Sequence, residues 1–281
     1  MTSLQNFPAT TWRDKLKYAA GYGLSRLHSR RTRQIYRRPE PQVTGLVDRA
    51  LLAFLKQRCR KEGRSRFFAR YHRSFWSGRG GAVYAENCDY RFQDIFLSQH
   101  RDAVTELEAA WAKLPQIKRV VEIGTGSGKL LAFLQERHPE LEALVGLDIN
   151  AAQIERNRAT YAQSGLEFHA CDAQDWIRRK GQPGTVFVTN CGVLEYFPQG
   201  DLEKLLAHIC RQLSPALFLA IEPLAVDHDL DHSLLSQTFG DELSFSHNYP
   251  HLFTKSGFHV AYQRESFFER YRTVILVATA V

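Results

Sequence analysis

The sequence lacks the features of membrane-spanning and of disulfide-linked proteins. No apolar run within its 281 residues reaches the roughly 18 residues that a transmembrane helix requires. Charged residues interrupt the first apolar stretch, so no secretory signal peptide is expected. The five cysteines are odd in number and form no Cys-x-x-Cys pair. This disfavours a disulfide framework and favours a reducing, cytoplasmic setting.

Acidic residues are scarce in the first 80 positions. These positions hold 19 Lys and Arg against four Asp and Glu, a net charge of +15, whereas the remaining 201 residues carry a net charge of −8. A strongly basic segment favours partners such as nucleic acid, an anionic lipid surface or an acidic substrate. These partners are therefore expected for the N-terminal part of the chain.

Residues 1–93 are predicted to form a basic helical region. Apolar residues recur every three or four positions across 12–27 and, more clearly, across 43–61, which predicts two amphipathic helices. Residues 12–38 are predicted either to contact nucleic acid or an anionic membrane surface, or to pack as a cap on the acidic remainder. Their Arg-rich composition also resembles a mitochondrial presequence, the alternative to a cytoplasmic location. Residues 64–76 interleave arginines with aromatic residues, which fits either base stacking or a lid helix.

Residues 94–281 show the alternation of a second, α/β domain. Apolar, β-rich runs alternate with helical patterns, which predicts a doubly wound, mostly parallel sheet of seven strands covered on both faces. The last two strands have only residues 265–271 between them, too few for a parallel crossover. The sheet is therefore expected to end in an antiparallel hairpin.

A glycine-rich loop follows the first predicted strand, which ends at Ile123. Gly124, Gly126 and Gly128 let the backbone turn sharply and approach a ligand closely at the start of the next helix. The dinucleotide fingerprint would require glycine where Lys129 stands, and the phosphate-binding loop pattern of nucleotide triphosphatases also fails. The loop thus predicts a cofactor site other than that for NAD or a nucleoside triphosphate.

An acid closes the second strand about 20 residues after this loop. Asp148 stands where acids of doubly wound sheets accept hydrogen bonds from ribose hydroxyls. With the strands on each side and the acid Glu122 before the loop, these segments resemble the motifs of class I, S-adenosylmethionine-dependent methyltransferases: 122–128, 146–150, 171–175 and 189–197.

The resemblance implies S-adenosylmethionine as cofactor and assigns residues to it. Gly124 and Gly126 would lie against the methionine part, and Asp148 would hold the ribose. Asp172 would bond the adenine amino group with the Ala173 amide nearby, and Asn190 would line the site beside the sulfonium. The predicted cofactor-binding residues are Glu122, Gly124, Gly126, Gly128, Asp148, Asp172, Ala173 and Asn190.

A hydroxyl acceptor also needs a base to take its proton. Many relatives have histidine after Leu-Glu in the fourth motif, where this chain has Tyr196. His247, within residues 244–250, is the predicted catalytic base; the alternative is a histidine hydrogen-bonded for structure. Residues 227–232 gather carboxylates and imidazoles, which fits either a hydrated loop or a divalent metal, and no resident metal is predicted.

The expected activity is methylation of a small-molecule or glycan hydroxyl. Asn190 is not followed by the Pro-Pro-Tyr of amine-methylating nucleic-acid enzymes, which argues against base N-methylation. The net charge of +15 on the first 80 residues keeps RNA methylation as the alternative. A cofactor-binding subunit without catalysis of its own is a third hypothesis.

Overall fold

The computed structural model describes residues 12–41, 43, 45–87, 92–268 and 271–281. Its α-helices are α1 (Trp12–Leu27), α2 (Ser29–Arg37), α3 (Leu46–Lys61), α4 (Ser65–Trp76), α5 (Arg79–Asn87), α6 (Arg101–Trp111), α7 (Lys129–Arg137), α8 (Ala151–Thr160), α9 (Ala173–Lys180), α10 (Gln199–Gln212) and α11 (Tyr249–Ser256). A π-helix, η1, spans Phe92–Leu97 and a 3₁₀ helix, η2, spans Leu194–Tyr196. None of the helices described is both long and apolar enough to cross a bilayer.

Seven strands form one sheet in the order β3-β2-β1-β4-β5-β9-β8. They are β1 (Arg119–Ile123), β2 (Ala143–Asp148), β3 (Glu167–Ala170), β4 (Thr185–Thr189), β5 (Ala216–Leu224), β8 (His259–Phe268) and β9 (Tyr271–Ala280). The first five are parallel, whereas β9 runs antiparallel between β5 and β8. The predicted fold class, with its terminal hairpin, is confirmed.

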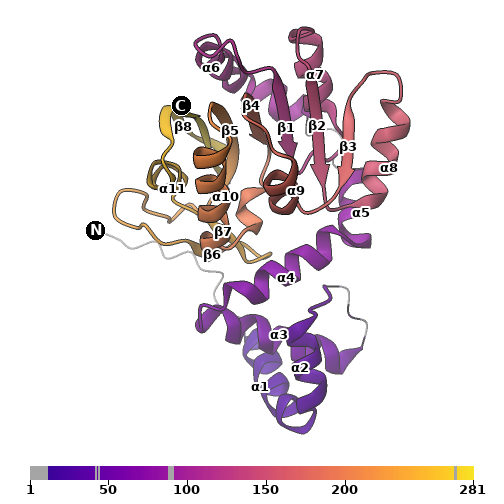
Figure 1. Ribbon diagram of the computed structural model, residues 1–281. Coiled ribbons are helices and arrows are strands. Elements are labelled where there is room, and N and C mark those ends of the chain that lie inside the picture. Colours follow the sequence, from indigo (N-terminus) through magenta and orange to yellow (C-terminus); the bar gives the residue numbers. More distant parts are fainter. Residues whose placement is uncertain (1–11, 42, 44, 88–91, 269–270) are drawn as a thin grey trace.

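The side chains of the buried strands divide between two cores because successive residues point to opposite faces. In β5, Phe218 packs in one core with Leu205 of α10 and Phe253 of α11. Its neighbour Leu219 packs in the other with residues such as Leu107 of α6. Helices α9, α10 and α11 thus cover one face and α6, α7 and α8 the other (Figure 1).

The N-terminal helices build a third core below the carboxyl edge of the sheet (Figure 1). Phe54 of α3 and Phe67 of α4 are buried there. A small hairpin of β6 (Gln237–Phe239) and β7 (Ser244–Ser246) contributes to this core. Leu243 directly precedes β7, and Phe245 lies within it. The helical region therefore packs on the α/β part of the chain through this core, while the partners of residues 12–38 stay a prediction. The boundary near residue 93 stays a prediction.

Helix α1 crosses α3 at very short range at Gly21. A Cβ added there would lie 2.4 Å from the carbonyl oxygen of Ala50 and 2.5 Å from Cβ of Phe54. Gly23, two residues on, has nothing within 4 Å of the same position. The first glycine is thus required by packing, and the second is not.

These two glycines give a matched pair of substitutions. Gly21→Ala should lower the free energy of unfolding by about 1–3 kcal/mol, because the obstructing atom is backbone and can move only with α3. Gly23→Ala should raise it by about 0.5–1 kcal/mol through helix propensity. Urea unfolding followed by circular dichroism measures both. Equal effects of the two substitutions would contradict the close crossing.

Candidate active site

The candidate site lies where the strand order reverses. Strand β1 pairs with β2 on one side and with β4 on the other. The helices that follow β1 and β4, α7 and α10, lie on opposite faces of the sheet, and the crevice at such a reversal is the usual ligand site of doubly wound sheets. The glycine loop follows β1 and residues 190–193 follow β4, so both predicted motifs meet there.

Backbone geometry explains the glycines of the first loop. Gly124, Gly126 and Gly128 have φ of 71°, 49° and 75°, the left-handed region that favours glycine. A Cβ at Gly124 would lie 2.6 Å from Cγ2 of Val193, so this glycine lets the two loops approach each other. A Cβ at Gly126 would meet nothing within 4 Å. The loop thus borders open space at its middle glycine.

Two carboxylates, those of Glu122 and Asp148, accept hydrogen bonds from this loop. The Oγ1 of Thr125 donates to Oε2 of Glu122 at 2.7 Å, and burial raises the pKa of Glu122 to about 8. The N–H of Gly126 donates to Oδ2 of Asp148 at 3.1 Å. Asn157 adds a bond from its amide to the carbonyl oxygen of Gly126 at 2.7 Å. Glu122 is therefore placed to shape the loop from within the core.

Asp148 retains capacity for a ligand. Its Oδ1 accepts from the N–H of Asn150 at 2.8 Å, and its Oδ2 from Gly126, whereas an ionised carboxylate offers about four acceptor positions. Burial raises the pKa of this carboxyl, and the backbone N–H donors oppose that rise. The remaining acceptor positions suit a pair of ribose hydroxyls.

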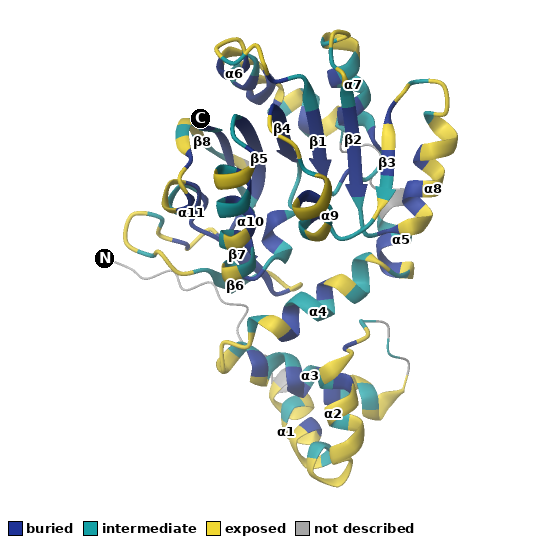
Figure 2. Ribbon diagram, in the orientation of Figure 1, coloured by how far each residue is buried: buried dark blue, intermediate teal, exposed yellow. Residues whose placement is uncertain are grey.

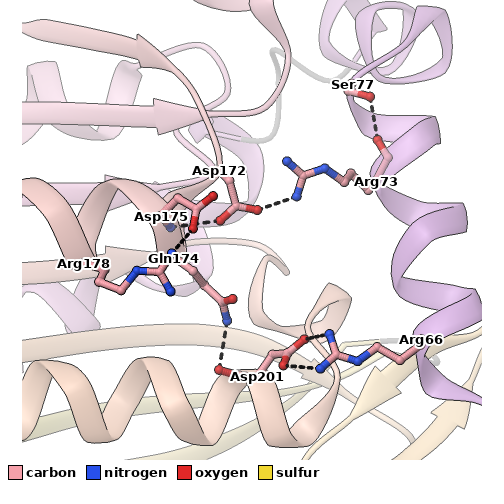
Figure 3. Close-up of polar contacts among 8 residues, drawn as sticks. All are labelled: Arg66, Arg73, Ser77, Asp172, Gln174, Asp175, Arg178 and Asp201. Carbon is pink, nitrogen blue, oxygen red and sulfur yellow. Dashed lines mark hydrogen bonds and ion pairs between the residues drawn. The ribbon is translucent and has the colours of Figure 1, made fainter.

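Asp172 performs a local and a long-range role. It caps α9, where its Oδ1 accepts from the N–H of Asp175 at 3.1 Å, so Ala173 is the first residue of that helix. Its Oδ2 pairs with the guanidinium of Arg73 from α4 (Figure 3). About two helical turns earlier in the same helix, Arg66 forms a two-pronged pair with Asp201 at 2.6 and 2.9 Å.

The loop after β4 is organised by an acid that sequence reasoning missed. Glu222 of β5 is fully buried, and its Oε2 accepts the N–H groups of Val193 and Leu194, both at 3.0 Å. Within this loop Cys191 has φ of 59°, rare outside glycine, and its thiol donates to Oδ1 of Asn190 at 3.2 Å. A lone carboxylate within the apolar run of β5 was the sequence signal for this role.

Residues 120–216 match a family model described as a methyltransferase domain, and this span covers β1 to the start of β5. Residues 120–216 thus carry a methyltransferase domain, and the whole sheet has the class I methyltransferase fold. Magnesium protoporphyrin IX methyltransferase from Synechocystis PCC 6803, solved with bound SAM, superposes with a TM-score of 0.53 at 13% identity, covering 76% of this chain and 97% of that one. A methyltransferase from Clostridium acetobutylicum ATCC 824 gives 0.51 at 8% identity, covering 70% and 98%. At such identities the likeness shows the fold.

Curated relatives match only part of the chain. A tRNA1(Val) (adenine(37)-N6)-methyltransferase from Cronobacter sakazakii is 27% identical over 110 residues, 36% of this chain and 45% of its own length. One from Erwinia tasmaniensis is 25% identical over 158 residues, 50% of this chain and 61% of its own. The chain spans about half the length of the curated relatives it matches.

The Synechocystis structures hold SAM or SAH, and the crevice of this chain offers groups that such a cofactor would contact. Open space at Gly126, free acceptor positions on Asp148 and the acid of Asp172 follow one another along the carboxyl edge. The Asn190 side chain stands half-buried at the end of β4. The individual contacts assigned by resemblance to these residues stay predictions.

The structure places His247 in the interior, fully buried. Its Nε2 donates to the carbonyl oxygen of Leu194 at 3.2 Å, and its Nδ1 lies 2.5 Å from Oγ of Ser236. Burial lowers the pKa of His247 to about 4. Because both ring nitrogens have protein partners, the geometry favours a structural histidine, and its role as catalytic base stays a prediction.

Residues 227–232 do not converge on one point. His228 is buried against Oγ of Ser246 at 2.8 Å, whereas His232 is exposed and contacts Asp229 at 3.0 Å. Across the described parts of the chain, no group of three or more His, Cys, Asp or Glu residues is arranged to hold a metal ion. These side chains point to separate structural roles.

Asp148→Ala should weaken S-adenosylmethionine binding by about 1–3 kcal/mol, since the ribose hydroxyls lose their acceptor. Isothermal titration calorimetry measures the effect. Asp94→Ala, a change in η1, serves as the control and should bind normally. Stabilisation of the wild-type chain by NAD, with none by S-adenosylmethionine, would overturn the assignment of the crevice.

Proposed function

We propose that this chain transfers the methyl group of S-adenosylmethionine to a hydroxyl of a small-molecule or glycan acceptor. The observation that carries the proposal is a buried carboxylate, Glu195, set against the loop after β4. A Cβ added at Gly192 would lie 2.4 Å from its Oε1. The carboxylate therefore borders the turn that follows Asn190, the side of the crevice where the methyl donor is expected.

An aromatic wall stands beside this carboxylate, at the neighbouring Tyr196. The ring of Tyr196 lies 5.2 Å from that of Trp76 and 5.2 Å from that of His72, both in α4. Tyr84 of α5 extends the wall, with its ring 4.9 Å from Trp76. Aromatic surfaces with a few polar groups are typical of pockets for small organic ligands. The wall favours an acceptor with an apolar face, such as a sugar ring or an aromatic ring.

The chemistry requires little of the protein beyond position and proton transfer. When bound, S-adenosylmethionine supplies an electrophilic methyl group on its sulfonium. The acceptor oxygen must lie in line with that group and must lose its proton as the new bond forms. Burial raises the pKa of Glu195 to about 8, so its ionised form is a stronger base than an exposed carboxylate. Glu195 takes the proton in this proposal.

RNA is the second candidate acceptor. Two observations favour it: the names of the curated relatives, which are tRNA adenine methyltransferases, and the net charge of +15 on the first 80 residues. Against it, the chain continues from Asn190 with Cys191-Gly192-Val193, whereas the amine-methylating enzymes have Pro-Pro-Tyr. The hydroxyl acceptor is therefore preferred.

A turnover assay separates the candidates. Release of the demethylated cofactor is measured with panels of glycans, hydroxylated metabolites and RNA. Turnover with a hydroxyl compound supports the proposal, and turnover with RNA alone replaces it by the second candidate. No turnover with any panel, despite cofactor binding, would indicate a cofactor-binding subunit.

Glu195→Gln tests the base. With the responsive acceptor, kcat should fall on the order of a hundredfold while cofactor affinity is unchanged. In the wild type, kcat should rise with pH through about 8 as the Glu195 carboxyl loses its proton, and the variant should lose this rise.

His247→Ala is the matched comparison. If His247 is structural, the variant should lose thermal stability and keep most of its kcat at temperatures where it is folded. A fall in kcat as large as that of Glu195→Gln, with the pH dependence lost, would return the role of base to His247.

A further inference from the structure

The N-terminal helices end in a defined tip. Helices α1 and α3 run antiparallel, because Gly21 contacts Ala50 while Tyr18 stacks near Lys61, with the Lys61 Nζ 5.1 Å from the ring. At a rise of about 1.5 Å per residue, the end of α1 and the start of α3 lie at the same end of the bundle. Helix α2 joins them there, since Nε of Arg31 donates to Oδ1 of Asp48 at 2.9 Å. This end lies far from the sheet (Figure 1).

Large apolar side chains stand in solvent at this tip. Leu27, the last residue of α1, is 80% exposed, and Leu46, the first of α3, is 81% exposed. Val47 beside it is 40% exposed. Figure 2 shows the tip mainly as exposed surface. No described residue covers these side chains, and removing them from water on a partner is favourable.

Arginines of α2, the helix that follows Leu27, line a hollow together with Arg38. Its volume is about 410 Å³, and it is lined by Arg30, Arg33, Gln34, Arg37 and Arg38. No carboxylate of the described residues pairs with its four guanidinium groups. Two acids of this region act on Arg31 instead: Asp48 pairs with it, and Glu40 acts on it through its charge. The hollow therefore offers unneutralised donors suited to phosphate oxygens.

We propose that this tip docks on an anionic lipid bilayer, with Leu27 and Leu46 inserted among the headgroups and the α2 arginines on their phosphates. Apolar side chains beside arginines are the pattern of interfacial membrane binding. The arginines alone could bind the phosphates of RNA equally well. RNA, however, binds through phosphates and through bases stacked on aromatic rings, so it does not explain two exposed leucines. The two exposed leucines therefore favour a lipid bilayer as the partner.

The test is flotation of the full chain with vesicles of phosphatidylcholine, with and without phosphatidylglycerol. The wild type should float with the anionic vesicles only, and less as salt rises. Arg30→Gln/Arg33→Gln/Arg37→Gln should lower the partition coefficient about a hundredfold. Leu27→Ser/Leu46→Ser should lower it at least about tenfold, because less apolar surface enters the bilayer.

Matched controls lie on the other domain. Leu234 and Leu235 are 51% and 73% exposed, and their double serine variant should float like the wild type. Arg179→Gln/Lys180→Gln/Arg211→Gln removes the same charge from exposed positions and should also float. Unchanged cofactor binding shows that each variant is folded.

Two results would overturn the proposal. One is a wild-type chain that does not float with anionic vesicles. The other is equal loss of flotation in the tip variants and in their controls, which would reduce the effect to overall charge or hydrophobicity. Filter binding to RNA is the companion measurement. RNA binding that needs the α2 arginines and not the leucines, without flotation, assigns the tip to RNA.

Discussion

The hydrogen bond from the N–H of Gly126 to the carboxylate of Asp148 joins the loop after β1 to the end of β2. The rest of the crevice depends on this bond. Because the loop has left-handed φ at three glycines, it has no regular backbone ladder of its own and needs partners from outside. Asp148, Asn157 and the buried Glu122–Thr125 pair supply them. With the loop fixed in this way, Gly124 can approach Val193, and the loops after β1 and β4 form one wall.

Much of the fold could be predicted because its signals are local. Strand–helix alternation, the glycines at 124, 126 and 128 and the short connection between β8 and β9 each lie within a few residues of sequence. The β6–β7 hairpin was missed, since its three-residue strands are too short for a pattern and are held by contacts with η2 and the N-terminal core.

The site was less predictable because its partners are distant in sequence. Arg73 and Asp172 are 99 positions apart, and Arg66 and Asp201 are 135 apart. Glu222 reaches back 28 residues to the N–H of Leu194. His247 illustrates the same difficulty. Its residue type and its place before a strand indicated a base, whereas its contacts with Ser236 and Leu194 could be found only from the fold. In both pairs the basic residue belongs to α4 and the acidic residue to the α/β part of the chain.

Helix α4 forms a wall of both halves of the crevice. Its Arg73 pairs with the acid that the family assigns to adenine, while its Trp76 and His72 face the loop after β4. Any shift of this helix that improves the fit of one ligand changes the surface offered to the other. The two binding sites are then thermodynamically linked. If bound cofactor raises the affinity for the acceptor by some factor, bound acceptor raises the affinity for the cofactor by the same factor.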